Sequence, residues 1–251
     1  SAYPAALWHS HEMLYGFAVA AMAGFLLTAI PNWTGRPPLT GKRLAAFCSL
    51  WIAGRVAVAL ASEIGLPVAA ALDLSFLALL WIYAVREVAA TRNWRNLPIA
   101  LAPGILLAGN ALVHADAMGA GAQGTLGTHI GIAVFVLLIA MIVGRIVPAF
   151  TGNWLRNTNR GEPFPGTSRL IEIASLLLTA AALVAWLVAP IHPVTSLLAG
   201  LAAIAHALRL ACWRGTRTGA EPLVWVLNLA YAWIPVGFHP LEIAASVPAQ
   251  V

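Results

Sequence analysis

Long runs of apolar residues that carry few or no charged side chains make up most of this chain. A run of about 20 such residues is long enough to cross a bilayer as a helix. Eight runs of this kind occur, over residues 13–31, 44–62, 66–85, 97–114, 127–147, 171–189, 194–212 and 222–240. Because the runs are continuously apolar rather than alternating, they indicate helices and not the strands of a barrel. We therefore predict an all-α, polytopic transmembrane bundle that forms one integral membrane domain over residues 1–251.

The composition agrees with a membrane protein. The chain is 61% hydrophobic and 9% charged, with a mean hydropathy of +0.84, whereas soluble domains carry about 25% charged residues. All of its 14 Lys and Arg residues except Arg55 fall at alternate helix ends: Arg36, Lys42, Arg43, Arg86, Arg92, Arg95, Arg145, Arg156, Arg160, Arg169, Arg209, Arg214 and Arg217. The intervening turns carry acids such as Glu63 and Asp116 instead.

This alternation is the positive-inside pattern of bacterial inner (plasma) membrane proteins. It predicts that residues 1–12 face the periplasm and that the arginine-rich loops face the cytoplasm. The sequence pI of 9.9 then reflects loop charge, so the expected partner is the lipid bilayer and not a nucleic acid.

The segment before the first run carries the most distinctive chemistry. His9, His11 and Glu12 stand directly before residues that hold no charge until Arg36. Imidazole and carboxylate groups together suit copper, iron or zinc, and histidine is a common axial ligand of haem. On a continuous helix, positions 9 and 11 point about 200° apart. Either the segment before Glu12 is extended, or only one of the two histidines is a ligand; the plain alternative is that both are interfacial polar residues.

Six of the seven histidines are predicted on the outer side of the bundle, His206 being the exception. His129, at the outer start of a long uncharged run, and His114, at the outer end of the preceding one, are candidate partners for the N-terminal pair. His192 and His239 stand beside prolines in outer turns or helix ends, and we interpret them as interfacial residues.

Arg55 and Asp73 form a second candidate pair. Each lies nine positions from Ile64, near the centre of an outer turn, which places both about 13 Å below that turn on neighbouring helices. Charges at that depth are costly unless they pair, so we predict an ion pair. The functional alternative is that Arg55 binds a haem propionate or an anionic substrate, with Asp73 orienting it.

The chain also contains an internal echo. The stretch AIPNWTG (29–35) resembles IVPAFTG (146–152), at an offset of 117 residues. The same offset brings His129 onto Glu12, so the echo predicts two parallel four-helix repeats, residues 9–120 and 121–245. Proline followed by glycine ends helices, and two similar helix ends are the simpler explanation.

Five stretches closely resemble the NnrS family, and they spread from the first residues to the last apolar run. They are WHSHEMLYGF (8–17), GFLLTAIPNWTG (24–35), WIAGR (51–55), GRIVPAFT (144–151) and YAW (231–233). The resemblance implies a haem- and copper-containing membrane protein of nitric oxide metabolism or nitrosative-stress resistance. It does not define a reaction, so whether the protein is an enzyme stays open.

The resemblance also implies site residues. His9 and His11 match the His-x-His-Glu motif as haem or copper ligands with Glu12 beside them, Arg55 matches the Gly-Arg of the second helix, and His129 is a further cofactor candidate. Asn228 stands where the family pattern has a histidine three residues before the tyrosine. Relatives have about twelve helices, including one before the His-x-His-Glu motif, so we expect this chain to be a fragment of something longer.

A cofactor-free transporter or channel is the alternative from another functional class. Parallel repeats, proline-interrupted helices and the Arg55–Asp73 pair are equally typical of transporters. The two hypotheses differ in whether the purified protein contains haem or metal.

Overall fold

The computed structural model describes residues 3–121, 124–158 and 166–246, and all regular elements in these ranges are helical. The predicted all-α class is therefore confirmed. Within the described residues, six helical segments are long and apolar enough to cross a membrane: Ala5–Thr34, Leu66–Ala90, Trp94–Ala117, Gly124–Asn157, Arg169–Val188 and Pro193–Cys212. The chain is thus a multi-pass membrane protein. The predicted runs 44–62 and 222–240 coincide with the helices Gly41–Ala59 and Pro222–Ser246; that these two also cross the membrane stays a prediction.

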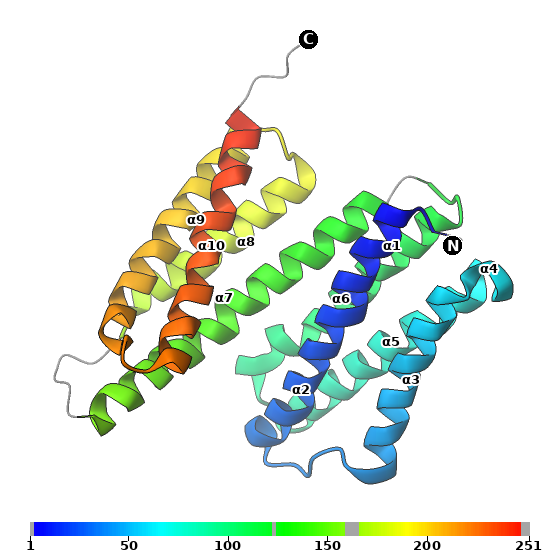
Figure 1. Ribbon diagram of the computed structural model, residues 1–251, viewed down its shortest axis with the longest axis horizontal. Coiled ribbons are helices and arrows are strands. Elements are labelled where there is room, and N and C mark those ends of the chain that lie inside the picture. Colours follow the sequence, from blue (N-terminus) through cyan, green and yellow to red (C-terminus); the bar gives the residue numbers. More distant parts are fainter. Residues whose placement is uncertain (1–2, 122–123, 159–165, 247–251) are drawn as a thin grey trace. The chain divides into compact units, whose positions relative to one another are not determined.

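The chain divides into two compact units, Ser1–Val134 and Phe135–Val251, which are described separately. The first unit contains α1 (Ala5–His11), the π-helical segment η1 (Glu12–Ala18) and α2 (Val19–Thr34) as one continuous rod. It continues with α3 (Gly41–Ala59), the short α4 (Ala61–Ile64), α5 (Leu66–Ala90), the turn η2 (Trp94–Asn96) and α6 (Leu97–Ala117). Helix α5 packs between α3 and α6 (Figure 1).

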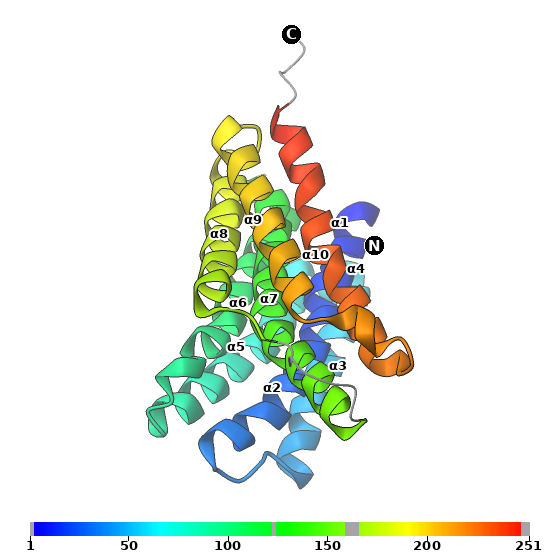
Figure 2. The same ribbon diagram turned by 90° about the vertical axis from the view of Figure 1, so that its left-hand side faces the viewer.

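Helix α7 (Gly124–Asn157) begins in the first unit and ends in the second. The second unit also contains α8 (Arg169–Val188), α9 (Pro193–Cys212), the turn η3 (Gly215–Thr218) and α10 (Pro222–Ser246). Helix α9 packs against both α8 and α10, and the three lie side by side in both views (Figure 1, Figure 2). The boundary at residue 134 does not test the repeat halves predicted from the internal echo, which stay a prediction.

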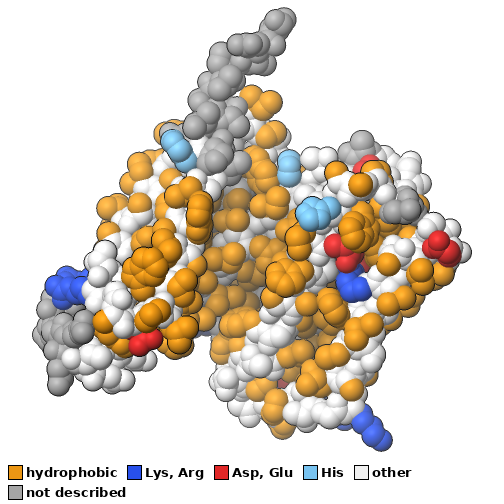
Figure 3. Space-filling view, in the orientation of Figure 1, with side chains coloured by type: hydrophobic (Ala, Val, Ile, Leu, Met, Phe, Trp, Pro, Cys, Tyr) orange, Lys and Arg blue, Asp and Glu red, His pale blue; other side chains and the backbone are white. Residues whose placement is uncertain are grey.

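Exposed apolar side chains cover much of the helix surface, as Figure 3 shows for one face. Phe17, Leu177 and Val188 are 68%, 65% and 79% exposed. Side chains of this kind are favourable against lipid tails, whereas a soluble protein rarely exposes large contiguous patches of them.

The two proline–glycine stretches behave differently. Helix α2 ends as expected, because Gly35 adopts φ +68° and its N–H donates to the carbonyl of Pro31. The second stretch does not end a helix: α7 continues through Pro148 to Asn157, so the simpler alternative of two similar helix ends was wrong. Val147, Thr151 and Leu155 are completely buried at four-residue intervals. Packing of this face offsets the hydrogen bond that proline removes.

Candidate metal site

The site begins at His11, which α1 turns into the interior of the first unit. Residues 5–11 are helical, so the predicted angle between His9 and His11 applies. His11 is 1% exposed, whereas His9 is exposed. The alternative of an extended segment before Glu12 was therefore wrong, and of the two histidines only His11 reaches the buried cluster.

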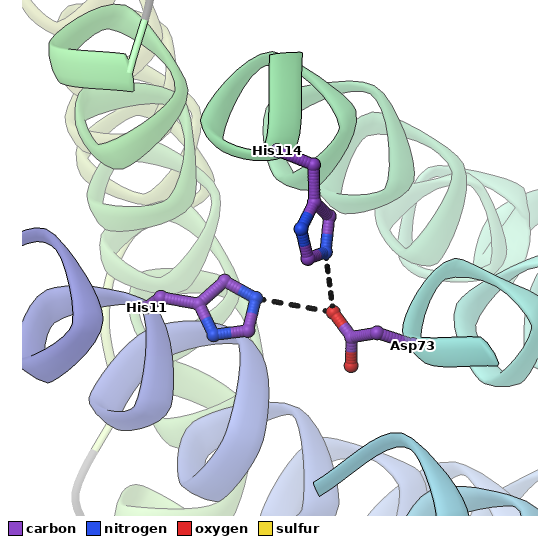
Figure 4. Close-up of side chains that lie close together, drawn as sticks. All are labelled: His11, Asp73 and His114. Carbon is purple, nitrogen blue, oxygen red and sulfur yellow. Dashed lines mark hydrogen bonds and ion pairs between the residues drawn. The ribbon is translucent and has the colours of Figure 1, made fainter. Parts of the chain in front are cut away.

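Two further helices bring ligand-type side chains to His11. Asp73 comes from α5 and His114 from the last turns of α6, and both are buried. Asp73 Oδ2 lies 3.1 Å from Nε2 of His11 and 2.9 Å from Nε2 of His114. The three side chains point toward one another (Figure 4), and their candidate ligand atoms all lie within 4.8 Å of each other.

Asn110 lies one helical turn before His114 and joins the same cluster. Its amide nitrogen donates to Asp73 Oδ2 at 2.7 Å, and its Oδ1 lies 3.0 Å from His11 Nε2. Glu12 Oε1 lies 3.1 Å from the other ring nitrogen of His11. His11 thus faces three oxygen atoms, from Asp73, Asn110 and Glu12.

Arg55 connects the two carboxylates of the cluster. Its Nη1 donates to Glu12 Oε1 at 2.5 Å, and its Nη2 forms an ion pair with Asp73 Oδ1. The predicted Arg55–Asp73 ion pair is therefore confirmed. One guanidinium against two carboxylates leaves a formal charge of −1 when the histidines are neutral, which favours a bound cation.

Two glycines allow the helices to approach at this depth. A Cβ on Gly16 would lie 2.9 Å from Nη1 of Arg55, and a Cβ on Gly54 would lie 3.1 Å from Cα of Asp73. Both matched the motifs that carry the family resemblance. Their role here is to make room for the Arg55 guanidinium and for close contact between α3 and α5.

Tyr3 closes the cluster from the segment that precedes α1. Its hydroxyl lies 2.7 Å from Nδ1 of His114, and its ring stacks near His11 with centroids 6.1 Å apart. The ring packs against Ala57, Val58 and Ala69. Burial raises the pKa of the Tyr3 hydroxyl to about 12, with Arg55 partly opposing this shift. The hydroxyl therefore stays protonated at physiological pH and is able to donate.

The structure brings together some of the predicted site residues and not others. His11, Glu12, Arg55 and His114 meet, whereas His9 lies on the exposed side of α1 and His129 lies outside the three-residue ligand cluster. Sequence reasoning missed Asn110 and Tyr3 and assigned Asp73 only as the partner of Arg55. The four-residue spacing between Asn110 and His114 is the signal that could have identified Asn110, because such residues share a helix face.

The second unit contains its own buried polar cluster, on α8, α9 and α10. His206 bonds with Thr179 at 2.6 Å and with the Tyr231 hydroxyl at 2.7 Å, and Arg209 donates to Tyr231 at 3.1 Å and to the carbonyl of Ala140 at 2.8 Å. Arg209 is 2% exposed. It lies in the last turn of α9, so its predicted place at a helix end is confirmed, and its burial there was not predicted. Asn228 is also buried, donating to Thr151, so the family position it occupies packs within this unit.

Fold and site together define a multi-pass helical membrane protein with a buried His–Asp–His cluster. Comparison with protein-family models matches residues 1–250 to the family described as NnrS protein. The chain belongs to the NnrS family, which suggests metal or haem binding. Comparison with curated proteins gave no match, and comparison with solved structures gave none either.

Proposed function

We propose that this protein binds copper at His11, Asp73 and His114 and acts in nitric oxide metabolism or in resistance to nitrosative stress. The observation that carries the proposal is the meeting of two imidazoles and one carboxylate, all buried, from three different helices. Buried ionisable groups in membrane segments are rare and usually functional.

The donor set fits a small metal ion. Nitrogen and oxygen ligands lie about 2.0–2.2 Å from such an ion, so neighbouring ligands in a tetrahedral arrangement stand about 3.4 Å apart. The two distances to Asp73 Oδ2 are 3.1 and 2.9 Å, a few tenths of an ångström below that separation, and the three ligand atoms all lie within 4.8 Å of one another. Imidazole with carboxylate suits copper, iron and zinc; copper is preferred here because of the family resemblance.

Haem does not fit inside this cluster. All four ring nitrogens of His11 and His114 already face side chains: Glu12, Asp73, Asn110 and Tyr3. These direct contacts leave no room for the planar haem macrocycle between the two histidines. Haem binding by the protein is a separate part of the proposal, for which the candidates outside the cluster are His9, from the family resemblance, and His129, from its place at the outer start of an uncharged run.

The surrounding residues would hold the ion and determine the net charge of the site around it. A copper ion supplies one-electron chemistry and a coordination position for nitric oxide. Asp73 provides the negative ligand, and Arg55 holds its second oxygen in place. Tyr3 orients His114, and Glu12 contacts Nδ1 of His11, as outer partners of metal-bound histidines usually do. Nitric oxide is small and uncharged, so the apolar surface is no barrier to it.

The charge distribution supports an orientation for the proposal. The cluster lies at the end of the first unit where α1 begins. The loop with Arg36, Lys42 and Arg43 follows α2 at the opposite end of the same helical rod. The positive-inside rule then favours an inner-membrane protein whose metal cluster lies near the periplasmic side.

Metal and haem analysis of purified variants tests this function. His11→Ala and His114→Ala are expected to lose copper measured by mass spectrometry, while His192→Ala retains it, because His192 is exposed and contacts only the backbone of its own turn. The copper-loaded protein should change its electron paramagnetic resonance spectrum with nitric oxide. Equal copper content in all variants would reject the assignment.

A cofactor-free transporter or channel is the alternative, and the π-helical segment Glu12–Ala18 beside the Arg55 ion pairs is the observation in its favour. Under that alternative, Arg55→Ala abolishes uptake of a substrate while wild-type protein purifies without stoichiometric metal. Metal bound to wild-type protein and lost from His11→Ala would decide against it.

A further inference from the structure

A large apolar cavity lies at the other end of the first unit. It has a volume of about 920 Å³ and is formed by α2, α3, the connection between them and Phe76 of α5. Its walls include Leu27, Phe47, Trp51 and Ile52. Gly24 of α2 also lines the cavity, and the space beside it is open, because a Cβ at this position would have no atom within 4 Å. The cavity therefore has the lining that a hydrocarbon chain requires.

A second cavity adjoins it and has the opposite character. Its volume is about 850 Å³, and Arg36, Pro38 and Leu39 line both cavities. Lys42, Arg43 and Arg86 complete its cationic wall, and Glu87 is the acid among its lining residues. Arg36 forms an ion pair with Glu87, so the other three cations exceed the acidic charge available in this cavity.

We propose that the two cavities together bind one anionic phospholipid, with an acyl chain in the apolar cavity and the phosphate against Lys42, Arg43 and Arg86. Basic pockets at the ends of transmembrane helices bind anionic lipid headgroups. A zwitterionic lipid would bring a cationic group against the same lysine and arginines. A free phosphate would leave the apolar cavity without an occupant. The inference does not depend on the proposed metal site.

Native mass spectrometry of detergent-solubilised protein tests this site, with cardiolipin and phosphatidylcholine of the same acyl chains as probes. Wild-type protein is expected to bind cardiolipin at least tenfold more tightly than phosphatidylcholine. Lys42→Gln/Arg43→Gln should weaken cardiolipin about tenfold, given the attraction of each basic side chain to anionic lipid. The matched control, Arg95→Gln/Arg217→Gln, removes two exposed cations that do not line the cavity.

Gly24→Leu tests the apolar part, since leucine favours the helix and extends into the cavity. It should weaken binding of cardiolipin, while Gly237→Leu, another helical glycine with open space around it, should not. If millimolar inorganic phosphate alone displaced cardiolipin from the protein, the site would be an anion site that does not hold a lipid chain, and the proposal would be overturned. Equal affinity for both lipids, or unchanged binding in either test variant, would also overturn it.

Discussion

Tyr3 and His114 are joined by a hydrogen bond of 2.7 Å between the phenolic oxygen and Nδ1. When the tyrosine donates, the neutral imidazole carries its proton on Nε2, which then donates to Asp73 Oδ2 at 2.9 Å. For Nε2 to be free to bind a metal ion, the imidazole proton must be on Nδ1, where the N–H donates a hydrogen bond to the tyrosine oxygen. One hydroxyl group therefore supports both tautomers without a net change in protonation.

Tyr3→Phe is expected to lower metal affinity about tenfold, since outer-shell partners of ligating histidines typically contribute 10- to 100-fold. The phenylalanine keeps the packing against α3 and α5 but removes the hydroxyl. A competition titration with a coloured copper chelator measures the change. Tyr83→Phe, which alters a tyrosine on α5 far along the helix from Asp73, is the control; equal affinities in the two variants would show that the Tyr3 hydrogen bond does not tune the site.

The same tyrosine gives a pH prediction. Burial raises the pKa of Tyr3 to about 12, compared with about 10 for a free phenol. Ionisation is therefore disfavoured in the folded state, and the contribution of this group to stability is complete below pH 10 and is lost as the pH rises toward 12. The difference in absorbance at 295 nm between wild type and Tyr3→Phe should have its midpoint near pH 12. A midpoint near pH 10 would mean that Tyr3 is exposed to water.

The helices and part of the cluster could be predicted from the sequence because their signals are local. Charge-free runs locate the helices, and the equal distance of Arg55 and Asp73 from one turn was sufficient to predict their ion pair. The helical angle between His9 and His11 left two alternatives, an extended segment or a single ligand, and the helix over residues 5–11 turns only His11 into the buried cluster. Each of these inferences uses only spacing along the chain.

The remaining contacts depend on packing between segments far apart in sequence. Tyr3 reaches His114, 111 residues away, only because the N-terminal segment packs against α3 and α5. Arg209 lies at the end of α9 as its position in the sequence predicted, but its burial depends on contacts with Tyr231 and Ala140 that the sequence does not report. No spacing in the sequence reports such contacts.

A close approach between α6 and α7 gives a further prediction. A Cβ on Gly127 would collide with the carbonyl oxygen of Gly109 and lie 2.8 Å from a methyl group of Val113. Gly127→Ala must separate the two helices and weaken the hydrogen bond from Tyr15 to the Gly127 carbonyl, 2.5 Å long. We expect a loss of about 1–3 kcal/mol, as for other overpacked sites. Gly237→Ala, with open space around it, should have no such effect in a thermal unfolding assay; a similar melting temperature for both variants would contradict the close approach.

Arg55 and Arg209 should respond differently to the same substitution. Arg55→Met removes the cation that pairs with Asp73, whose side chain is 4% exposed and keeps only its contacts with the neutral donors of the cluster. Arg209→Met removes the cation near Glu172, whose side chain is 44% exposed and 3.6 Å from the guanidinium. Breaking a buried pair costs about 3–5 kcal/mol because the remaining charge stays desolvated. Glu172 can instead be hydrated, so the second variant loses the hydrogen bonds from Arg209 to Tyr231 and Ala140 but leaves no desolvated charge, and it should lose less stability than Arg55→Met.

Thermal unfolding in detergent measures the contrast, with a drop of roughly 10 °C expected for Arg55→Met. Adding Asp73→Asn to Arg55→Met should recover part of that drop, because the amide removes the charge while keeping the shape of the side chain. If the double variant is no more stable than Arg55→Met, the loss arises from packing around the guanidinium rather than from the unpaired carboxylate. Equal drops for the two single arginine variants would mean that exposure of the acidic partner does not decide the cost.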